Sequence, residues 1–299
     1  YFAYSLKINN FPSLRAPHLR LLGTGTENEG LMEPSWWASR KFWLMWAGYA
    51  GAIAIWYASV KWLPIDSFNR LPDPWAVVRE WFNPNPAYGI SVFTPNYYIH
   101  ILYSVYRATA AFFLAVLLGV PLGIMMGWNR TFNAYASALV GLLRPVPPLA
   151  WIPLAILLFP GIEIAVIYVT FLVAFFATTM NTYVGVKSID PDYFRAAASL
   201  GSRPRDVLRH VIIPGALPNI VTGIRTGMGF AWRGLIAAEM IATNVGLGYM
   251  LFVARDFYRT EVIVFGMIVI GVLWLLIDRL LLVPLERATI ERWGMVRRA

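Results

Sequence analysis

Five ionisable residues lie within long apolar stretches of this 299-residue sequence, where burying a charge is costly and needs a reason. Arginine carries forked N–H donors that hydrogen-bond an oxyanion through two atoms at once, so arginines along a membrane conduit would favour an anion in transit. A glutamate beside them would restrain an arginine or take part in a gate. The alternative for each charge is an ion pair between helices or subunits that never meets a solute. The residues are Arg107, Arg144, Arg225, Arg233 and Glu239.

Three of these residues share one apolar stretch, and helical periodicity relates their positions. Arg225 and Glu239 differ by about 40° around a helix and lie about 21 Å apart along it. Arg233 lies about 80° from Arg225, at the border of the same stripe. The three residues therefore share a face without touching. Glu163 is different, because it follows a tight turn at 159–162 and is predicted to face the water outside.

Motifs of the common nucleotide-binding and catalytic sites are missing from the sequence. A phosphate-binding loop of the pattern G-x-x-x-x-G-K-[ST] needs a lysine after a glycine. None of the four lysines, Lys7, Lys41, Lys61 and Lys187, follows one. The patterns G-x-S-x-G and H-E-x-x-H are also missing, there is no cysteine, and the three histidines are scattered. We therefore expect a non-catalytic chain that binds no metal or cofactor and does not itself hydrolyse ATP.

The composition is typical of a membrane protein. Hydrophobic residues make up 58% of the chain and charged residues 14%, whereas a soluble domain has about 25% charged residues. Several uncharged runs reach the roughly 18 residues that cross a bilayer as a helix. The sequence predicts an all-α integral membrane protein with one transmembrane domain over 42–290 and six spans. These spans are 42–63, 101–127, 136–158, 162–186, 219–243 and 262–285.

Lysine and arginine are unevenly distributed over the predicted loops. Segments 1–41 and 187–218, Arg130 and the chain after residue 286 hold fifteen of them, and the opposite side holds four. Cytoplasmic loops carry the excess of basic residues, so the first group is predicted to be cytoplasmic. Both termini then lie in the cytoplasm, with 1–41 as a segment free or at the membrane interface and 291–299 as a tail. The net charge of +9 reflects this asymmetry, and no nucleic-acid partner is expected.

The third predicted span, 136–158, is rich in proline. Each proline removes a backbone donor and bends a helix. Breaks at membrane depth persist only where protein or a water-filled cavity satisfies the freed carbonyls. One interpretation is a broken helix beside a pathway, and the other is a kink that only shapes packing. The prolines are Pro145, Pro147, Pro148 and Pro153, and the pathway interpretation uses Arg144, Pro147 and Pro148.

The basic segment 187–218 begins with the pattern of a short helix. Asp190 or Asp192 is placed to cap this helix near Tyr193, because a short carboxylate accepts hydrogen bonds from the free amides of a first turn. Gly201 follows at a distance where the end of a helix often needs a positive φ.

A second short helix is predicted from Pro204 to Ile213, since proline is favoured in the first turn of a helix. Pro214 and Pro218 are expected to end it before the next span. Both helices are partly apolar and lie outside the membrane. Either a partner protein covers them, or they lie on anionic lipid headgroups.

The spacing in this segment resembles the EAA loop of bacterial ABC-importer permeases. That loop reads Glu-Ala-Ala, three residues, Gly, nine residues, then Ile-x-Leu-Pro, and this sequence matches the offsets from residue 195 to residue 214. Arginine stands at 195 where the family usually has glutamate, so the charge contact of that glutamate is in doubt here. The resemblance implies a coupling helix pair that docks on a separate ATPase subunit. The residues it places there are Arg195, Ala196, Ala197, Leu200, Gly201, Arg205, Leu208 and Pro214.

Further motifs are similar to the nitrate, sulfonate and taurine type of these permeases over about residues 70–290. They imply the type I ABC-importer permease fold. The pathway residues predicted from the charges and the proline break at membrane depth are Arg144, Pro147, Pro148, Arg233 and Glu239. The motifs are RPVPPLAWIPLAILLF, NTYVGVKSIDPDYFRAAASLG, PGALPNIVTGIRTGMGFAWRGLIAAEM, GLGYMLF and LLIDRLL.

The same resemblance implies a set of partners in the bacterial cytoplasmic membrane. They are a second copy of the chain in a homodimer, two cytoplasmic ATPases that bind ATP and Mg²⁺, and an external binding protein that delivers a small oxyanion. Sulfonate, taurine, nitrate and bicarbonate are the implied solutes. One alternative is a secondary transporter or channel driven by an ion gradient, although we find no inverted repeat. A membrane-embedded enzyme is another, although we find no reactive constellation.

Overall fold

The computed structural model describes residues 40–62, 71–86 and 90–291. Every regular element within these ranges is a helix, which confirms the all-α prediction for the described part of the chain. The predicted N-terminal segment 1–41 and tail 291–299 lie almost wholly outside the described residues.

The chain divides into two units, residues 1–52 and 53–299, and each is described by itself. The described part of the first unit is the start of α1 (Arg40–Trp62). Trp43 and Trp46 are exposed there, at 66% and 53%. Exposed tryptophans are typical of the aromatic belt at a membrane interface.

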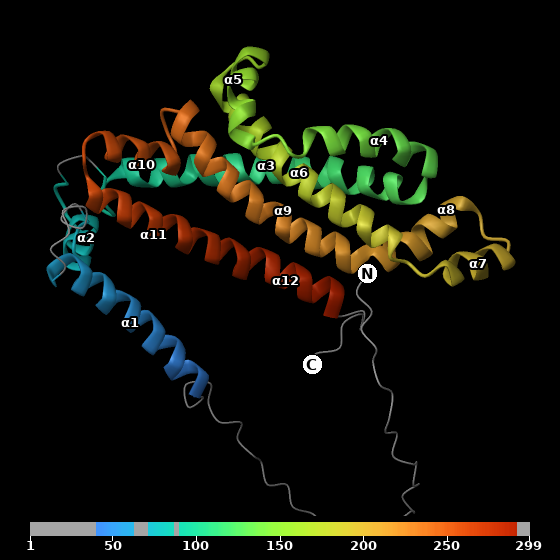
Figure 1. Cartoon of the computed structure of the whole chain (residues 1–299), viewed down its shortest axis with the longest axis horizontal. Helices are drawn as coiled ribbons and strands as arrows, with labels where there is room; N and C mark the ends of the chain where they lie inside the picture. Colours follow the sequence, from blue (N-terminus) through green and yellow to red (C-terminus); the bar gives the residue numbers. More distant parts are fainter. Residues whose placement is uncertain (1–39, 63–70, 87–89, 292–299) are drawn as a thin grey trace, which may run out of the picture. The chain divides into compact units, whose positions relative to one another are not determined.

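Three long helices that pack against one another form the centre of the second unit: α3 (Pro95–Trp128), α6 (Ile162–Lys187) and α9 (Ile213–Ala242) (Figure 1). They approach closely because glycines face their neighbours across the contacts. A Cβ added to Gly123 of α3 would lie 2.6 Å from the carbonyl oxygen of Thr179 on α6. α6 and α9 are packed in the same way.

Four helical stretches of the described chain are long and apolar enough to cross a membrane, and a bent pair of helices gives a fifth. The four stretches contain or overlap the predicted spans at 101–127, 162–186, 219–243 and 262–285. α1 overlaps the predicted span 42–63 and has the length of a span, but it is not one of the four. The six-span count therefore stays a prediction. The four stretches are Pro95–Trp128, Ile162–Lys187, Pro204–Ala242 and Thr260–Thr289.

The predicted span 136–158 is not one helix. α4 (Arg130–Leu143) and α5 (Pro148–Leu158) are bent by 100° across residues 144–147. Pro145 and Pro147 fall in this break and have no N–H with which to continue the helix. The helix is therefore broken within the predicted span, and the pathway beside the break stays a prediction.

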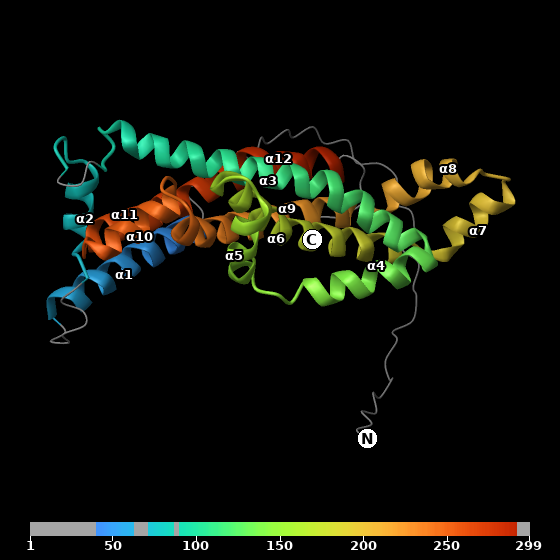
Figure 2. The same cartoon turned by 90° about the horizontal axis from the view of Figure 1, so that it is seen from above.

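At one end of the unit, α2 (Pro74–Trp81) packs on α11 (Thr260–Ile277). The carboxylate of Asp73 accepts a hydrogen bond from the amide of Ala76 at 2.7 Å and caps α2. The ring of Trp81 stacks on that of Phe265 with centroids 6.1 Å apart. α10 (Leu247–Asp256) precedes α11 at this end. After α11 the chain runs toward the other end of the unit through three short helices (Figures 1 and 2): η4 (Asp278–Leu282), α12 (Val283–Glu286) and η5 (Arg287–Glu291).

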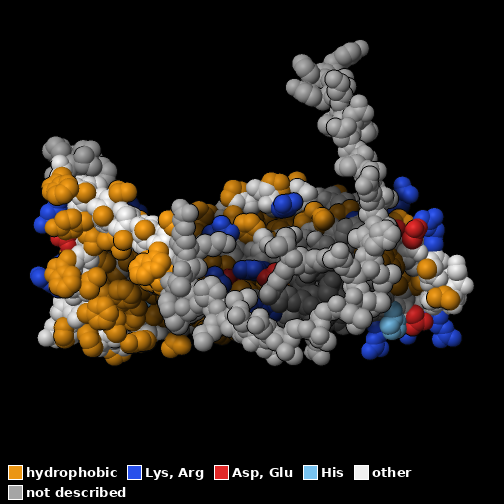
Figure 3. Space-filling model, turned by 90° about the horizontal axis from the view of Figure 1, so that it is seen from below, with side chains coloured by type: hydrophobic (Ala, Val, Ile, Leu, Met, Phe, Trp, Pro, Cys, Tyr) orange, Lys and Arg blue, Asp and Glu red, His pale blue; other side chains and the backbone are white. Residues whose placement is uncertain are grey.

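Apolar side chains cover much of the described surface, as lipid contact requires. Leu117, Leu157 and Leu280 are exposed at 68%, 84% and 68%. Figure 3 shows apolar side chains in orange over broad areas of one face, while blue and red charged side chains gather at the end formed by residues 191–207.

Candidate functional site

Residues 188–207 leave the bundle between α6 and α9, and their two short helices project beyond its end (Figures 1 and 2). α7 (Pro191–Ser199) is capped by Asp190, whose carboxylate accepts a hydrogen bond from the amide of Asp192 at 2.9 Å. Arg195 pairs with Asp192 on the exposed face. The predicted first helix is confirmed, and Asp190 is the residue that caps it.

The second predicted helix continues where it was expected to stop. α8 (Pro204–Val207) passes into the π-helical stretch η3 (Leu208–Ile212) and then into α9. The amide of Ile213 bonds to the carbonyl of Leu208, and Pro214 follows in the first turn of α9, where a proline is tolerated. The helical stretch is therefore continuous from Pro204 to Ala242, and the predicted end at Pro214 and Pro218 is wrong.

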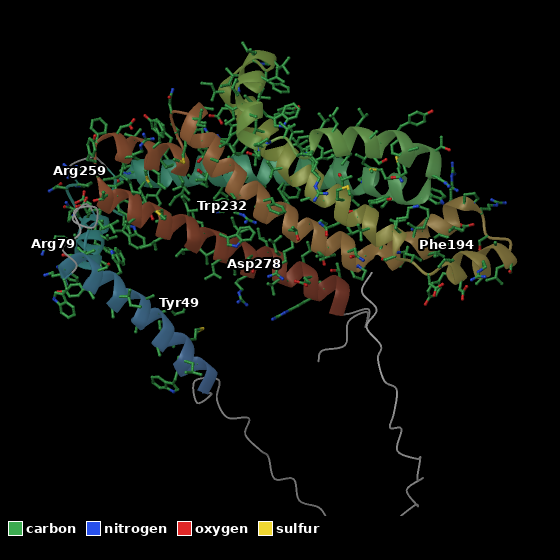
Figure 4. All side chains as sticks on the ribbon, viewed as in Figure 1. Tyr49, Arg79, Phe194, Trp232, Arg259 and Asp278 are labelled. Carbon is green, nitrogen blue, oxygen red and sulfur yellow. The ribbon has the colours of Figure 1, made fainter. Side chains whose placement is uncertain are left out.

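Most residues predicted to contact an ATPase face outward. Leu200 has the largest exposure of them, at 84%. Ala197 is buried, with only 8% of its surface exposed, so it supports the packing of this segment and is not placed for direct contact with a partner. Phe194, labelled on α7 in Figure 4, is half-buried and packs in the apolar cluster around Ile212. The exposed set is Arg195, Ala196, Leu200, Gly201 and Arg205, and Leu208 and Pro214 are half-buried.

Gly201 makes the turn between the two short helices. Its φ is +67°, and the amides of Gly201 and Ser202 bond back to the carbonyls of Ala198 and Ala197 at 3.0 Å. An added Cβ would meet nothing within 4 Å, so the requirement for glycine is one of backbone conformation and not of space. Residues other than glycine and asparagine rarely adopt this conformation.

We predict that Gly201→Val leaves membrane insertion unchanged but weakens association with the ATPase. The β-branched side chain raises the free energy of the turn by about 1–2 kcal/mol and shifts α7 against α8. Co-purification of the ATPase measures the effect, and Gly201→Asn is the matched control because asparagine tolerates a positive φ. Wild-type recovery of the ATPase with the valine variant would contradict the prediction.

At the opposite end of the bundle, three of the charges considered in the sequence pair with one another. Arg107 of α3 is fully buried between two glutamates. Its Nε and Nη2 atoms donate to Glu163 at the start of α6, at 2.7 and 2.6 Å, and its Nη1 donates to Glu239 of α9 at 2.7 Å. Glu163 is half-exposed, and its two described hydrogen bonds both come from Arg107, while its contact with the water outside stays a prediction.

Glu239 also caps the helix that follows it. Its carboxylate accepts hydrogen bonds from the hydroxyl of Ser104 at 2.8 and 2.9 Å and from the amide of Gly248 at 3.0 Å. Gly248 lies in the first turn of α10, so the negative charge lies at the favourable end of that helix. The sequence offered two roles for Glu239, and this geometry is that of a glutamate that restrains an arginine, namely Arg107.

Arg225 is paired at the other end of α9. Its Nε and Nη2 atoms donate to Asp278 at 2.9 and 3.0 Å, and Nη1 donates to Glu286 at 2.7 Å. Figure 4 labels Asp278 near the junction of α11 and α12. This is the interhelical ion pair that the sequence left open as an alternative for Arg225.

Arg144 and Arg233 have no ion pair among the described residues. Arg144 lines a cavity of about 310 Å³ at the break between α4 and α5, together with Pro148, Trp151 and Phe230. The guanidinium of Arg233 lies 4.9 Å from the centre of the Phe230 ring. The cavity thus brings together Arg144 and Pro148, two residues predicted for the pathway, and Arg233 lies against its lining residue Phe230.

Several partners of the charged residues were not found by sequence reasoning. Ser104 and Gly248, on other helices, donate hydrogen bonds to Glu239. Asp278 and Glu286 accept hydrogen bonds from Arg225. Asp278 carried a detectable signal, because it is a lone carboxylate in the apolar run LLIDRLL. Ser104 carried none, since a single serine in a membrane helix is unremarkable.

The fold and this site define a helical membrane permease with an exposed segment for a partner. The chain belongs to the family of binding-protein-dependent transport system inner membrane components, whose profile matches residues 119–283. It is 37% identical to the taurine transport system permease protein of Escherichia coli over 243 residues, 81% of this chain and 87% of that protein. It is 35% identical to the bicarbonate transport system permease protein of Synechococcus elongatus over 191 residues, 64% of this chain and 66% of that protein.

The fold is similar to that of a solved methionine ABC transporter in inward-facing conformations. The TM-score is 0.56 at 18% sequence identity, and the match covers 64% of this chain and 94% of that one. The similarity confirms the predicted ABC-importer permease fold. Across the curated relatives named above, the chain spans 66% to 87% of their length.

Proposed function

We propose that the chain is the transmembrane subunit of an ATP-driven importer and forms its translocation pathway. The observation that carries this proposal is the projecting pair α7 and α8, turned by Gly201 at a φ of +67°. A transport chain without a phosphate-binding loop does not hydrolyse ATP through such a loop, so ATP-driven transport would need a separate ATPase. An exposed segment of this kind offers that ATPase a docking surface. The alternative cover, anionic lipid headgroups, explains the arginines but not the conformation of the turn.

The partners follow from this role. Two ATPases that bind ATP and Mg²⁺ would dock on α7 and α8, a second copy would complete a homodimer, and an external binding protein would deliver the solute. A hollow of about 640 Å³ beside α7, lined in part by Tyr193, His210 and Pro214, offers space for an ATPase side chain. We place both termini in the cytoplasm on the strength of the basic loops, and the complex in the bacterial inner membrane.

A small oxyanion is the solute class that the site favours. Arg144 and Arg233 are the two candidate arginines without an ion pair among the described residues. Arg144 lines the cavity at the α4–α5 break, and Arg233 lies against Phe230, which also lines it. Unpaired guanidinium groups are able to bind an oxyanion through two donors each. The similarity to permeases named for taurine and bicarbonate transport points to the same class.

We predict that Arg144→Ala lowers anion uptake by about tenfold, because a charge-assisted hydrogen bond contributes about 1.5–3 kcal/mol. Arg233→Ala acts in the same direction. Both variants are expected to assemble like the wild type, since neither arginine holds an ion pair among the described residues. Uptake of labelled solute by proteoliposomes, with complex yield measured in parallel, checks the result. Unchanged uptake would remove these arginines from the pathway.

Reconstitution tests the function as a whole. Liposomes that hold the chain and a co-purified ATPase, supplied with binding protein outside and ATP inside, are expected to take up the solute only when all components are present. Uptake by the chain alone under a proton or sodium gradient would contradict the proposal and support the secondary-transporter alternative.

A further inference from the structure

Arg107 joins three helices and the loop before α10 at the end of the bundle away from α7 and α8. It lies on α3 and donates to Glu163 of α6, to Glu239 of α9 and, through Nη1 at 2.6 Å, to the carbonyl of Val245 just before α10. The side chain of Arg107 is fully buried, so each of these acceptors replaces water that the guanidinium has lost.

The Glu239 side of this network is closed. Glu239 is fully buried, and three donors from α3 and α10 surround its carboxylate. A Cβ added to Gly246, whose φ is +139°, would lie 2.5 Å from that carboxylate, and one added to Gly248 would lie 2.3 Å from the carbonyl of Ile236. Backbone and side chains therefore fix this side in one arrangement.

The Glu163 side is open. The side chain of Glu163 is 49% exposed, and its two described hydrogen bonds both come from Arg107. Gly161 precedes α6 with a φ of +102°, and an added Cβ there would meet nothing within 4 Å. The first turn of α6 thus carries one described ion pair beside Gly161, and Ala165 and Val166 pack in the apolar core just after it.

Glu163 lies a few residues beyond the end of α5, whose start lines the cavity. Residues 159–161 join α5 to α6, and Pro148 and Trp151 of α5 line the cavity that also contains Arg144. A displacement of the α5–α6 corner would therefore move one wall of that cavity. The Arg107–Glu163 pair is the described ion pair at this corner, and it adds to the apolar packing of α5 on α6 and α9.

We infer that Arg107 and Glu163 form a releasable latch, a pair of positioning residues that holds the α5–α6 corner in one state of the transport cycle. This inference rests on the proposed function. When the pair separates, water replaces the two charge-assisted hydrogen bonds between Arg107 and Glu163. The carboxylate of Glu163 is already half-exposed, so water solvates it as soon as it moves away from Arg107. The Glu239 side keeps the buried charge of Arg107 compensated while the latch is open.

The test uses the full complex in proteoliposomes and the variant Glu163→Gln. The amide keeps the shape of the side chain but lacks the charge, so the latched conformation becomes less stable relative to the released one. We expect ATP hydrolysis without binding protein to rise and solute uptake per ATP to fall by about tenfold, while complex yield and thermal stability stay at wild-type values. Glu163→Asp retains the charge and is expected to restore most of the coupling. Glu261→Gln, at the first turn of α11 and without a described ion pair, is the matched control.

A second measurement reports the corner directly. The chain has no cysteine, so a fluorophore on Leu158→Cys, at the end of α5 and 62% exposed, labels one site. ATP is expected to change its emission in the otherwise wild-type complex, and Glu163→Gln is expected to produce the changed emission without ATP.

Three outcomes separate the ideas. A wild-type complex without ATP-dependent uptake contradicts the proposed function. A coupled wild type whose Glu163→Gln variant keeps normal uptake per ATP and normal emission contradicts the latch alone. Loss of assembly in both Glu163 variants would make the pair a structural contact and would also overturn the latch.

Discussion

Arg107→Ala is expected to destabilise the membrane complex by about 3–5 kcal/mol, the cost of removing one partner from a buried ion pair. The substitution leaves Glu239 buried with its charge uncompensated and takes a hydrogen-bond donor from the carbonyl of Val245. Thermal unfolding of the detergent-solubilised complex measures the effect. Arg107→Lys is expected to fall between the wild type and Arg107→Ala, because an ammonium group lacks the planar fork that reaches both glutamates.

Arg79→Ala is the control for this substitution. Arg79 lies on α2 at the same end of the unit, is exposed and has no described ion pair, so its loss is expected to change the free energy of unfolding by less than about 0.5 kcal/mol. Equal effects of the two substitutions would show that Arg107 is not the centre of a stabilising network.

Gly123→Ala is expected to separate α3 from α6 and to lower stability by about 1–3 kcal/mol, the usual cost of overpacking. The new Cβ would lie 2.6 Å from the carbonyl oxygen of Thr179 and 2.6 Å from the Cβ of its neighbour Thr182, so the two backbones must move apart. The yield of folded protein after membrane extraction and its unfolding temperature check the result.

The chain offers a matched control in Gly141. It lies within α4, and an added Cβ would meet nothing within 4 Å. Gly141→Ala is expected to be neutral or to stabilise α4 by up to about 1 kcal/mol, since alanine favours a helix more than glycine does. A loss of stability as large as that from Gly123→Ala would show that the close α3–α6 contact does not account for the effect at Gly123.

Local patterns predicted the short-range features of the coupling segment. The cap at Asp190 and the turn at Gly201 depend on the residues within one helical turn of each, and the structure confirms both. The end of the second helix was mispredicted for the same reason. Pro214 stops a regular helix, but a π-helical stretch placed the proline in the first turn of α9, and the helix continued.

Long-range pairing was beyond local reasoning. Arg107 and Glu239 are 132 positions apart, and Arg225 and Glu286 are 61 apart. Helical periodicity placed Arg225 and Glu239 on one stripe, but it could not tell which charges on other helices would meet them. The sequence therefore left ion pairing and pathway lining as alternatives for the arginines. Packing of α3, α9 and the α11–α12 stretch provided partners for Arg107 and Arg225.

The unbroken helical stretch from Pro204 to Ala242 has a mechanical consequence. At about 1.5 Å per residue, its 39 residues follow a helical path about 58 Å long, which changes direction between α8 and α9 at the π-helical stretch (Figure 1). One end of the stretch belongs to the segment proposed to receive the ATPase, and the other holds Glu239 beneath α10. In the proposed importer, a movement of α8 would be transmitted to Glu239 and α10 through one continuous helical stretch. This stretch would bend most easily at its π-helical residues and at Pro218. A conformational change of the proposed ATPase would thus displace residues at the opposite end of the bundle without unfolding any helix.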